Sequence, residues 1–215
     1  VPIEASFPPI AELADRLSYT GYVVDRPALP DWPVGPIGEG EVIVSVGGGA
    51  VGLPLLRAAL AARPLSRLAD RTWRMIAGPN LPDAAFSELA WSKPPGVIVE
   101  RWRPDLPVLF AHCALSISQA GYNTVMDLLR AGARCVLVPF ADDGESEQTL
   151  RAQVLEQRGR VTVADAATLS PEILAAAIDR ALTLPAASVD IDDSGVETTA
   201  KFIQRLCREA EDRRG

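Results

Sequence analysis

Two glycine-containing turns carry the residues whose types and spacing could do chemistry in this 215-residue sequence. The first turn, Gly47 to Gly52 (GGGAVG), fits the pattern G-x-G-x-x-G, and the second runs from Ser118 to Asp127 (SQAGYNTVMD). Each turn follows an apolar run typical of a strand and leads into a helical pattern. Glycine lets backbone N–H groups approach a phosphate closely, and the free N–H groups at a helix N-terminus attract anions. The two turns therefore predict a phosphate-containing ligand.

The second turn adds side chains that suit a nucleotide. Asn123 and Thr124 stand in the first turn of the predicted helix, where the helix dipole and the threonine hydroxyl strengthen an anion site. Asp127 follows one turn later, and its carboxylate can accept two hydrogen bonds from a ribose diol. A purely structural alternative stays open, in which Asn123 or Thr124 only caps the helix and Asp127 only complements its dipole.

The first turn also permits a nicotinamide-binding module. That interpretation requires an acidic residue about 20 positions further on, at the end of the second strand, for the ribose hydroxyls. The second predicted strand, 73–77, ends instead in Gly-Pro-Asn, and Asp70 precedes it. A nicotinamide-binding Rossmann module and a merely structural glycine turn both remain as alternatives.

The two turns can meet only if the strands before them end at a common edge of one sheet. From Glu41 onward, apolar runs alternate with helical patterns. Continuous apolar strands separated by helices indicate a parallel sheet covered on both faces. The predicted fold class is α/β, a Rossmann-like doubly wound parallel sheet. The predicted strands are 42–46, 73–77, 97–100, 115–117, 135–138 and 161–163, and the predicted helices are 52–62, 82–91, 106–112, 122–131, 146–157 and 171–182.

The chain is expected to have three parts. Residues 1–40 are rich in proline and glycine and read as a linker and lead-in segment, with a short helix at 10–17 and a short strand at 21–24. Residues 41–189 form the Rossmann-like domain. Residues 190–215 hold a C-terminal amphipathic helix, which could pack on this domain or on one that is missing here. Without an initiator methionine, the sequence is expected to be part of a longer protein.

Composition excludes several functional classes. A net charge of −7, with no Lys/Arg-rich run before the C-terminal tail, argues against a nucleic-acid partner. The single histidine rules out a multi-histidine metal centre, and three cysteines without a C-x-x-C pair predict free thiols in a reducing compartment. No apolar run approaches the roughly 20 residues that span a bilayer. We therefore expect a cytoplasmic protein with no metal, cofactor or transmembrane segment.

The second turn resembles the donor-binding signature of the GT-B glycosyltransferases, T-H-C-G-W-N-S-x-x-E. Gln119 stands at the usual histidine, Tyr122 at the tryptophan, and Asp127 at the ribose-binding glutamate. The resemblance implies that Gln119 contacts the sugar and Asp127 the ribose. It assigns the donor diphosphate to Gly47, Gly48 and Gly49 of the first turn and to Gly121, Tyr122, Asn123 and Thr124 of the second.

Flanking motifs extend the resemblance over residues 41 to 182. The run Trp102-Arg103-Pro104-Asp105 is similar to W-x-P-Q, which implies that Trp102 stacks on the base and Asp105 contacts it. Glu147 and Gln148 are similar to the acidic-Gln pair that binds sugar hydroxyls. Within the GT-B proteins the chain looks most like the C-terminal donor-binding domain of the MurG-like group, glycosyltransferase family 28.

The resemblance implies a hexosyltransferase domain that binds a UDP- or dTDP-sugar without metal, the leaving diphosphate being stabilised by helix N–H groups and hydroxyls. Retaining GT-B families often carry two glutamates eight positions apart. The first would fall on Gln119, which favours an inverting mechanism. In the family the catalytic base lies in an N-terminal acceptor domain, so this chain alone is expected to bind donor without transferring sugar. That missing domain could also attach the protein peripherally to a membrane.

Two further expectations follow. His112 is expected at a helix end on the far edge of the sheet, so no catalytic residue is assigned in this chain. A nucleotide-sugar epimerase-like GT-B domain is kept as an alternative to the transferase.

Overall fold

The computed structural model describes residues 12–13, 15–24, 37–48, 51–140, 146–185, 192 and 194–212. The chain divides into two compact units, which we describe separately. One comprises Val1 and Pro27–Val189, and the other comprises Pro2–Arg26 together with Asp190–Gly215. The predicted site residues all lie in the first unit.

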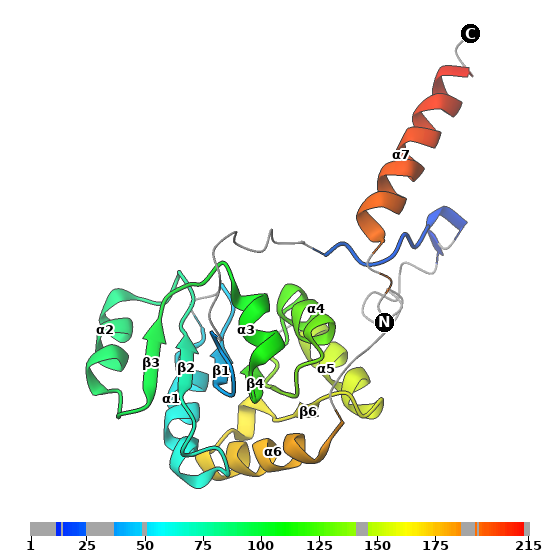
Figure 1. Cartoon of the computed structure of the whole chain (residues 1–215). Helices are drawn as coiled ribbons and strands as arrows, with labels where there is room; N and C mark the ends of the chain where they lie inside the picture. The colour runs from blue at the N-terminus through cyan, green and yellow to red at the C-terminus, as the bar shows by residue number, and fades with distance from the viewer. Residues whose placement is uncertain are drawn as a thin grey trace. The chain divides into compact units, whose positions relative to one another are not determined.

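A six-stranded sheet forms the centre of the first unit (Figure 1). Every strand pair is parallel, and the order across the sheet is β3-β2-β1-β4-β5-β6. This confirms the predicted Rossmann-like doubly wound parallel sheet. The strands are β1 (Val42–Ser45), β2 (Trp73–Ile76), β3 (Val97–Glu100), β4 (Leu115–Ser118), β5 (Cys135–Leu137) and β6 (Thr162–Val163).

The helices that alternate with these strands also match the predictions to within one residue at each end. They are α1 (Leu53–Ala62), α2 (Asp83–Ser92), α3 (Leu106–His112), α4 (Tyr122–Ala131), α5 (Glu147–Gln157) and α6 (Pro171–Thr183), with short 3₁₀ turns η3 (Arg63–Leu65) and η4 (Ala166–Thr168). Local capping explains some of these ends. Ser170 accepts a hydrogen bond from Ile173 N at the start of α6, and Gly132 closes α4 in the left-handed conformation.

One face of the sheet carries most of the hydrophobic core. Val42 and Val44 of β1, with Val46 directly after it, point into this core and meet apolar side chains of α1, α2 and α6. Trp73 of β2 is fully buried there, and its indole Nε1 donates to Leu68 O at 3.0 Å. Burying this much apolar surface on one side holds β1 and β2 in fixed register.

The other face is covered by α3 and α4, which pack against each other (Figure 1). This face contains buried polar groups as well as apolar ones. Ser116 and Ser118 of β4 share a 2.8 Å hydrogen bond between their hydroxyls, and Arg74 of β2 forms ion pairs within it. This face is therefore marked by the buried ion pairs of Arg74.

The second unit joins the N-terminal segment to α7 (Gly195–Asp212), the predicted amphipathic helix. Tyr22 N donates to Asp192 O at 2.9 Å, and Gly195 N donates to Tyr22 O at 3.2 Å. Thr20 and Thr199 share a 2.7 Å hydrogen bond. The predicted strand at 21–24 is wrong, because this segment bonds to the start of α7 and to no strand among the described residues.

Candidate functional site

The strand order reverses between β1 and β4, and the two glycine-containing turns follow these two strands. In open α/β sheets ligands bind beyond the carboxyl ends of the strands where the order reverses. Ser45 and Ser118 are paired at the ends of the two strands, and Gln119 N donates to Ser45 O at 3.1 Å. The fold therefore brings the start of the first turn beside the start of the second, as a shared ligand site requires.

The first turn begins with exposed glycines that leave room for a ligand. Gly47 has a positive φ of 66°, and Gly48 has open space within 4 Å of the position where a Cβ would stand. A Cβ on Gly47 would lie 3.9 Å from Oε1 of Gln119, which places that side chain beside the turn. Gly49, the third predicted diphosphate-binding glycine, lies outside the described residues.

A third loop supports the first turn. After β2, Gly78 adopts a positive φ of 76°, and a Cβ there would lie only 2.3 Å from Gly47 O. Asn80 Nδ2 donates a hydrogen bond to Gly48 O. Our sequence interpretation missed both residues, because it used Gly-Pro-Asn only to argue against a nicotinamide site. A glycine after the second strand was the signal that could have indicated close backbone approach.

At the second turn, Gly121 is the N-cap of α4 and no side chain caps this helix. The N–H groups of the first helical turn have no acceptor within the helix, and with the helix dipole they favour an anion at this end. Asn123 and Thr124 lie inside that first turn, Asn123 exposed and Thr124 half-buried. The alternative that either residue is the N-cap is therefore wrong. Asp127 is half-buried one turn further along α4.

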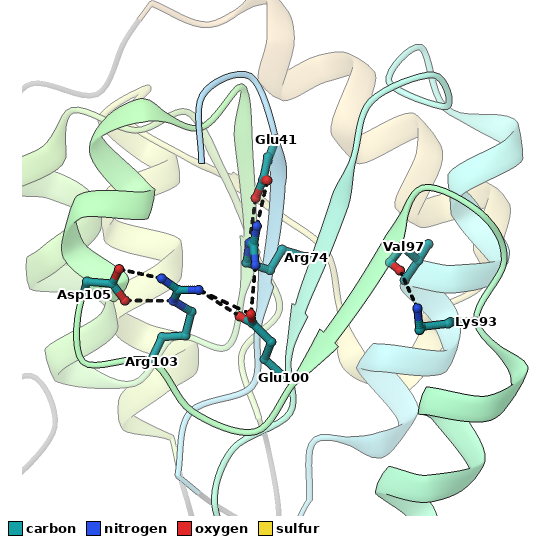
Figure 2. A network of polar contacts seen from close by, with 7 residues as sticks. All are labelled: Glu41, Arg74, Lys93, Val97, Glu100, Arg103 and Asp105. Atoms are coloured by element: carbon teal, nitrogen blue, oxygen red, sulfur yellow. Dashed lines mark hydrogen bonds and ion pairs between the residues drawn. The ribbon is translucent and has the colours of Figure 1, made fainter. Parts of the chain in front are cut away.

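The two predicted base-binding residues follow β3 but differ in environment. Trp102 is 65% exposed, as a stacking surface requires, whereas Asp105 at the start of α3 is only 8% exposed. Arg103 holds the Asp105 carboxylate in a two-pronged ion pair, with Nε–Oδ1 2.8 Å and Nη2–Oδ2 2.6 Å (Figure 2). Since α3 packs beside α4 and both begin at the carboxyl edge of the sheet, this loop flanks the second turn.

Figure 2 shows that this ion pair continues into the sheet. Arg103 Nη1 lies 3.3 Å from Glu100, and Arg74 bridges Glu100 at 2.9 Å and Glu41 at 2.7 and 2.8 Å. A chain of five alternating charges thus ties the Trp102 loop to β1, β2 and β3. Sequence spacing had suggested a role for Asp105 alone of the five.

The ion pair makes Asp105 a contributor to stability that depends on pH. The hydrogen bond from Arg103 holds the Asp105 pKa below its ordinary value, despite desolvation by burial. Because the folded-state pKa lies below the unfolded value of about 3.9, the stabilisation is present above that pH and is lost as pH falls through the folded-state pKa.

We expect Asp105→Asn to lower the free energy of unfolding by about 1–3 kcal/mol at neutral pH. The difference from wild type should narrow as pH falls below about 4. Urea denaturation at a series of pH values measures this. Asp83→Asn is the control, because Asp83 pairs with Arg101 but its side chain is 97% exposed. A difference that stays constant down to the most acidic pH would refute the assignment.

The predicted sugar-binding pair lies at the start of α5. Gln148 Oε1 accepts a hydrogen bond from Phe140 N at 3.2 Å, which ties the helix to the end of the β5 loop. Glu147 is exposed and forms an ion pair with Arg151 one turn along. Residues 141–145 of the preceding acidic loop lie outside the described residues.

The remaining candidates for chemistry lie away from this edge or are inert. His112 ends α3, before β4, at the amino edge of the sheet as predicted. Burial raises the pKa of Cys113 and Cys135 to about 12, so both are neutral thiols near neutral pH. Within the described ranges no group of His, Cys, Asp and Glu side chains could hold a metal ion, and no helix there is long and apolar enough to cross a membrane.

Sequence comparison with known proteins finds relatives that share one enzyme name. The UDP-N-acetylglucosamine--N-acetylmuramyl-(pentapeptide) pyrophosphoryl-undecaprenol N-acetylglucosamine transferase of Synechococcus sp. (strain CC9902) is 31% identical over 148 residues, covering 67% of this chain and 38% of that protein. The enzyme of the same name from strain CC9605 is 27% identical over 189 residues, covering 85% of this chain and 49% of that protein. The chain thus spans half or less of the length of these relatives.

Solved structures share the fold. The glycotransferase of kitacinnamycin superposes with a TM-score of 0.61 at 21% identity, covering 84% of this chain and 43% of that one. MurG of Acinetobacter baumannii gives a TM-score of 0.58 at 19% identity, covering 78% of this chain and 50% of that one. Residues 43–206 match the glycosyltransferase family 28 C-terminal domain. With that match over most of its length, the chain belongs to the glycosyltransferase family 28 C-terminal domain family, as a MurG-like domain of the GT-B fold.

Proposed function

We propose that this chain is the donor-binding domain of an inverting, metal-independent hexosyltransferase that uses a UDP- or dTDP-sugar. The observation that carries the proposal is the meeting of two turns at the point where the strand order reverses. There the exposed Gly47–Gly48 backbone and the uncapped N-terminus of α4 come together. In a chain of net charge −7, these backbone groups supply the positive potential that a diphosphate needs.

The nucleotide would lie along this edge in a defined order. Gly47, Gly48, Gly49 and the first turn of α4 would hold the diphosphate, Asp127 the ribose, and the Trp102 loop the base. Gln119, Glu147 and Gln148 would face the sugar. UDP is favoured as the carrier because the curated relatives are named as UDP-N-acetylglucosamine transferases. Metal independence is proposed because the N–H groups of α4 and the Thr124 hydroxyl can stabilise the departing diphosphate electrostatically.

Sugar transfer also needs an acceptor site and a base, which we assign to a second domain. The support is that the chain spans only 38% and 49% of the two relatives described above. Inversion is supported by Gln119, which lacks the carboxylate that a retaining family would place there. Donor binding without transfer is therefore expected for the 215-residue chain. We place the intact protein in the cytoplasm, with membrane attachment, where it occurs, through the second domain.

We expect calorimetry to detect binding of UDP or dTDP to the wild-type chain, and Asp127→Ala to weaken that binding about 10- to 100-fold. The reason is that a carboxylate's hydrogen bonds to a diol are worth about 1.5–3 kcal/mol. Asp70→Ala is the matched control, since Asp70 is an exposed acid placed before β2 at the amino edge. Absence of binding to both nucleotides and their sugars would contradict the donor site.

A nicotinamide-binding module would bind NADH and would not respond to UDP or dTDP. Asp70 precedes β2, and the residues directly after that strand, at the edge where the glycine turn lies, are Ala-Gly-Pro-Asn without an acid. An NADH fluorescence titration separates the two functions. Saturable NADH binding that Asp70→Ala weakens, with no response to UDP or dTDP, would replace the donor-site proposal.

A further inference from the structure

One arginine on α5 reaches back to the second turn. The Arg151 side chain is 12% exposed, and its Nη1 donates to Ala120 O at 2.8 Å. The same guanidinium lies 5.6 Å from the centre of the Tyr122 ring and forms an ion pair with Glu147. A single shielded cation therefore contacts the backbone before α4, the first residue of α4 and the first residue of α5.

The contact with Ala120 controls the peptide that leads into the anion site. Ala120 C=O and Gly121 N–H belong to one planar trans peptide, so the two groups point in opposite directions. With the carbonyl held toward Arg151, the Gly121 N–H is directed away from it. A side chain 31 residues along the chain thus helps to fix the peptide orientation at this point.

On the Gly121 side of this peptide, side-chain packing supplies no restraint. A Cβ built on Gly121 would meet no atom within 4 Å, and glycine itself restricts its backbone least of all residues. Gly121 adopts φ −60° and ψ 147°, a backbone conformation that most residue types can also adopt. Ala120 is fully buried, so packing holds that side of the peptide, and the hydrogen bond from Arg151 adds a directional restraint on its carbonyl.

We propose that Arg151 is a positioning residue of the donor site, which aligns the Gly121 N–H with the diphosphate and holds Tyr122 and Glu147 in place. The inference rests on the proposed function and deepens it, since Arg151 acts through the backbone and not as a ligand of the phosphate. It also couples the diphosphate side of the site on α4 to the sugar side on α5.

Arg151→Met tests the proposal, because it keeps much of the aliphatic length but removes the donors. We expect UDP affinity, measured by calorimetry, to fall about tenfold, and Arg151→Lys to recover most of it through one hydrogen bond to Ala120 O. Arg158→Met is the matched control. It removes the same charge from an exposed residue at the end of the same helix and should change the affinity less than twofold.

An amide spectrum distinguishes a residue that orients the Ala120–Gly121 peptide from one that only attaches α5 to the rest of the domain. In ligand-free protein, the ¹⁵N–¹H resonance of Gly121 should move in Arg151→Met, return toward its wild-type position in Arg151→Lys, and stay in place in Arg158→Met. A tether would lower the melting temperature and leave both this resonance and UDP affinity unchanged, which would overturn the proposal. Should Arg151→Met not fold, Arg151→Leu, which also has no donor, takes its place with the same expected loss.

Failure of the donor site and failure of the Arg151 role give different results. If the wild-type chain binds neither UDP nor dTDP, the proposed function is wrong, whereas the Gly121 resonance in ligand-free protein still reports on the peptide. If wild type binds and Arg151→Met binds equally well, the donor site stands and the role of Arg151 does not.

Discussion

Replacing Arg74 by methionine is expected to lower the free energy of unfolding by about 3–5 kcal/mol, the largest loss from any single ion-pair partner described above. The Arg74 side chain is 10% exposed and its main partner Glu41 is 15% exposed. Methionine would leave the Glu41 carboxylate shielded from water without its counter-charge, and Glu100 with Arg103 alone. Urea denaturation of the two proteins, monitored by circular dichroism, measures the difference.

A double variant and a surface control test whether burial of the ion pair causes this loss of stability. Adding Glu41→Leu to Arg74→Met should recover a large part of the loss, because a buried pair replaced on both sides by apolar groups is close to neutral. Arg57→Met removes the Arg57–Glu88 pair, whose side chains are 54% and 59% exposed, and should cost less than about 1 kcal/mol. Equal losses for Arg74→Met and Arg57→Met would show that burial of the Arg74 network contributes nothing.

Gly78→Ala is expected to cost about 2–4 kcal/mol of stability and to weaken UDP binding about tenfold or more. An alanine at φ +76° is strained by about 1–2 kcal/mol, and its Cβ would stand 2.3 Å from Gly47 O. Relief of that clash requires the first turn to shift. A displacement of about 1 Å in a positioning element can cost as much as a hundredfold in function. Denaturation and calorimetry on the same preparation measure both effects.

Gly159 provides the matched control. It has a similar positive φ of 64°, but a Cβ there would meet nothing within 4 Å. Gly159→Ala should therefore show the backbone strain alone, with UDP affinity unchanged. If Gly78→Ala and Gly159→Ala lose the same stability and bind UDP equally, close packing of Gly78 on the first turn has no functional consequence.

These variants also mark the limit of prediction from sequence. The second turn was interpretable because its residues are contiguous. A strand, a glycine and a helix start follow one another within ten positions, so local pattern alone places Gly121 at the helix N-terminus. Asn80 and Arg151 were missed for the converse reason. Their partners, Gly48 and Ala120, are 32 and 31 residues away, and neither pair has a shared local pattern.

Asp105 shows the intermediate case. Its position beside Trp102 indicated a role in base recognition, and the structure confirms that both residues follow β3 at the carboxyl edge. What spacing could not indicate was the direction of the side chain. The carboxylate is buried against Arg103, because two strands supply Glu100 and Arg74 to continue the charge network beneath it.

The sequence by itself determined the elements and the sheet edge at which the candidate site residues lie. Apolar runs without polar interruption specify buried parallel strands, and in such a sheet all turns that follow strands meet at one edge. The tertiary structure alone decided how the turns are held. Gly78 and Asn80 support the first turn, Arg151 the second, and Arg74 the Trp102 loop, through contacts between residues about 30 positions apart. Such contacts depend on strand order and register, which no local pattern encodes.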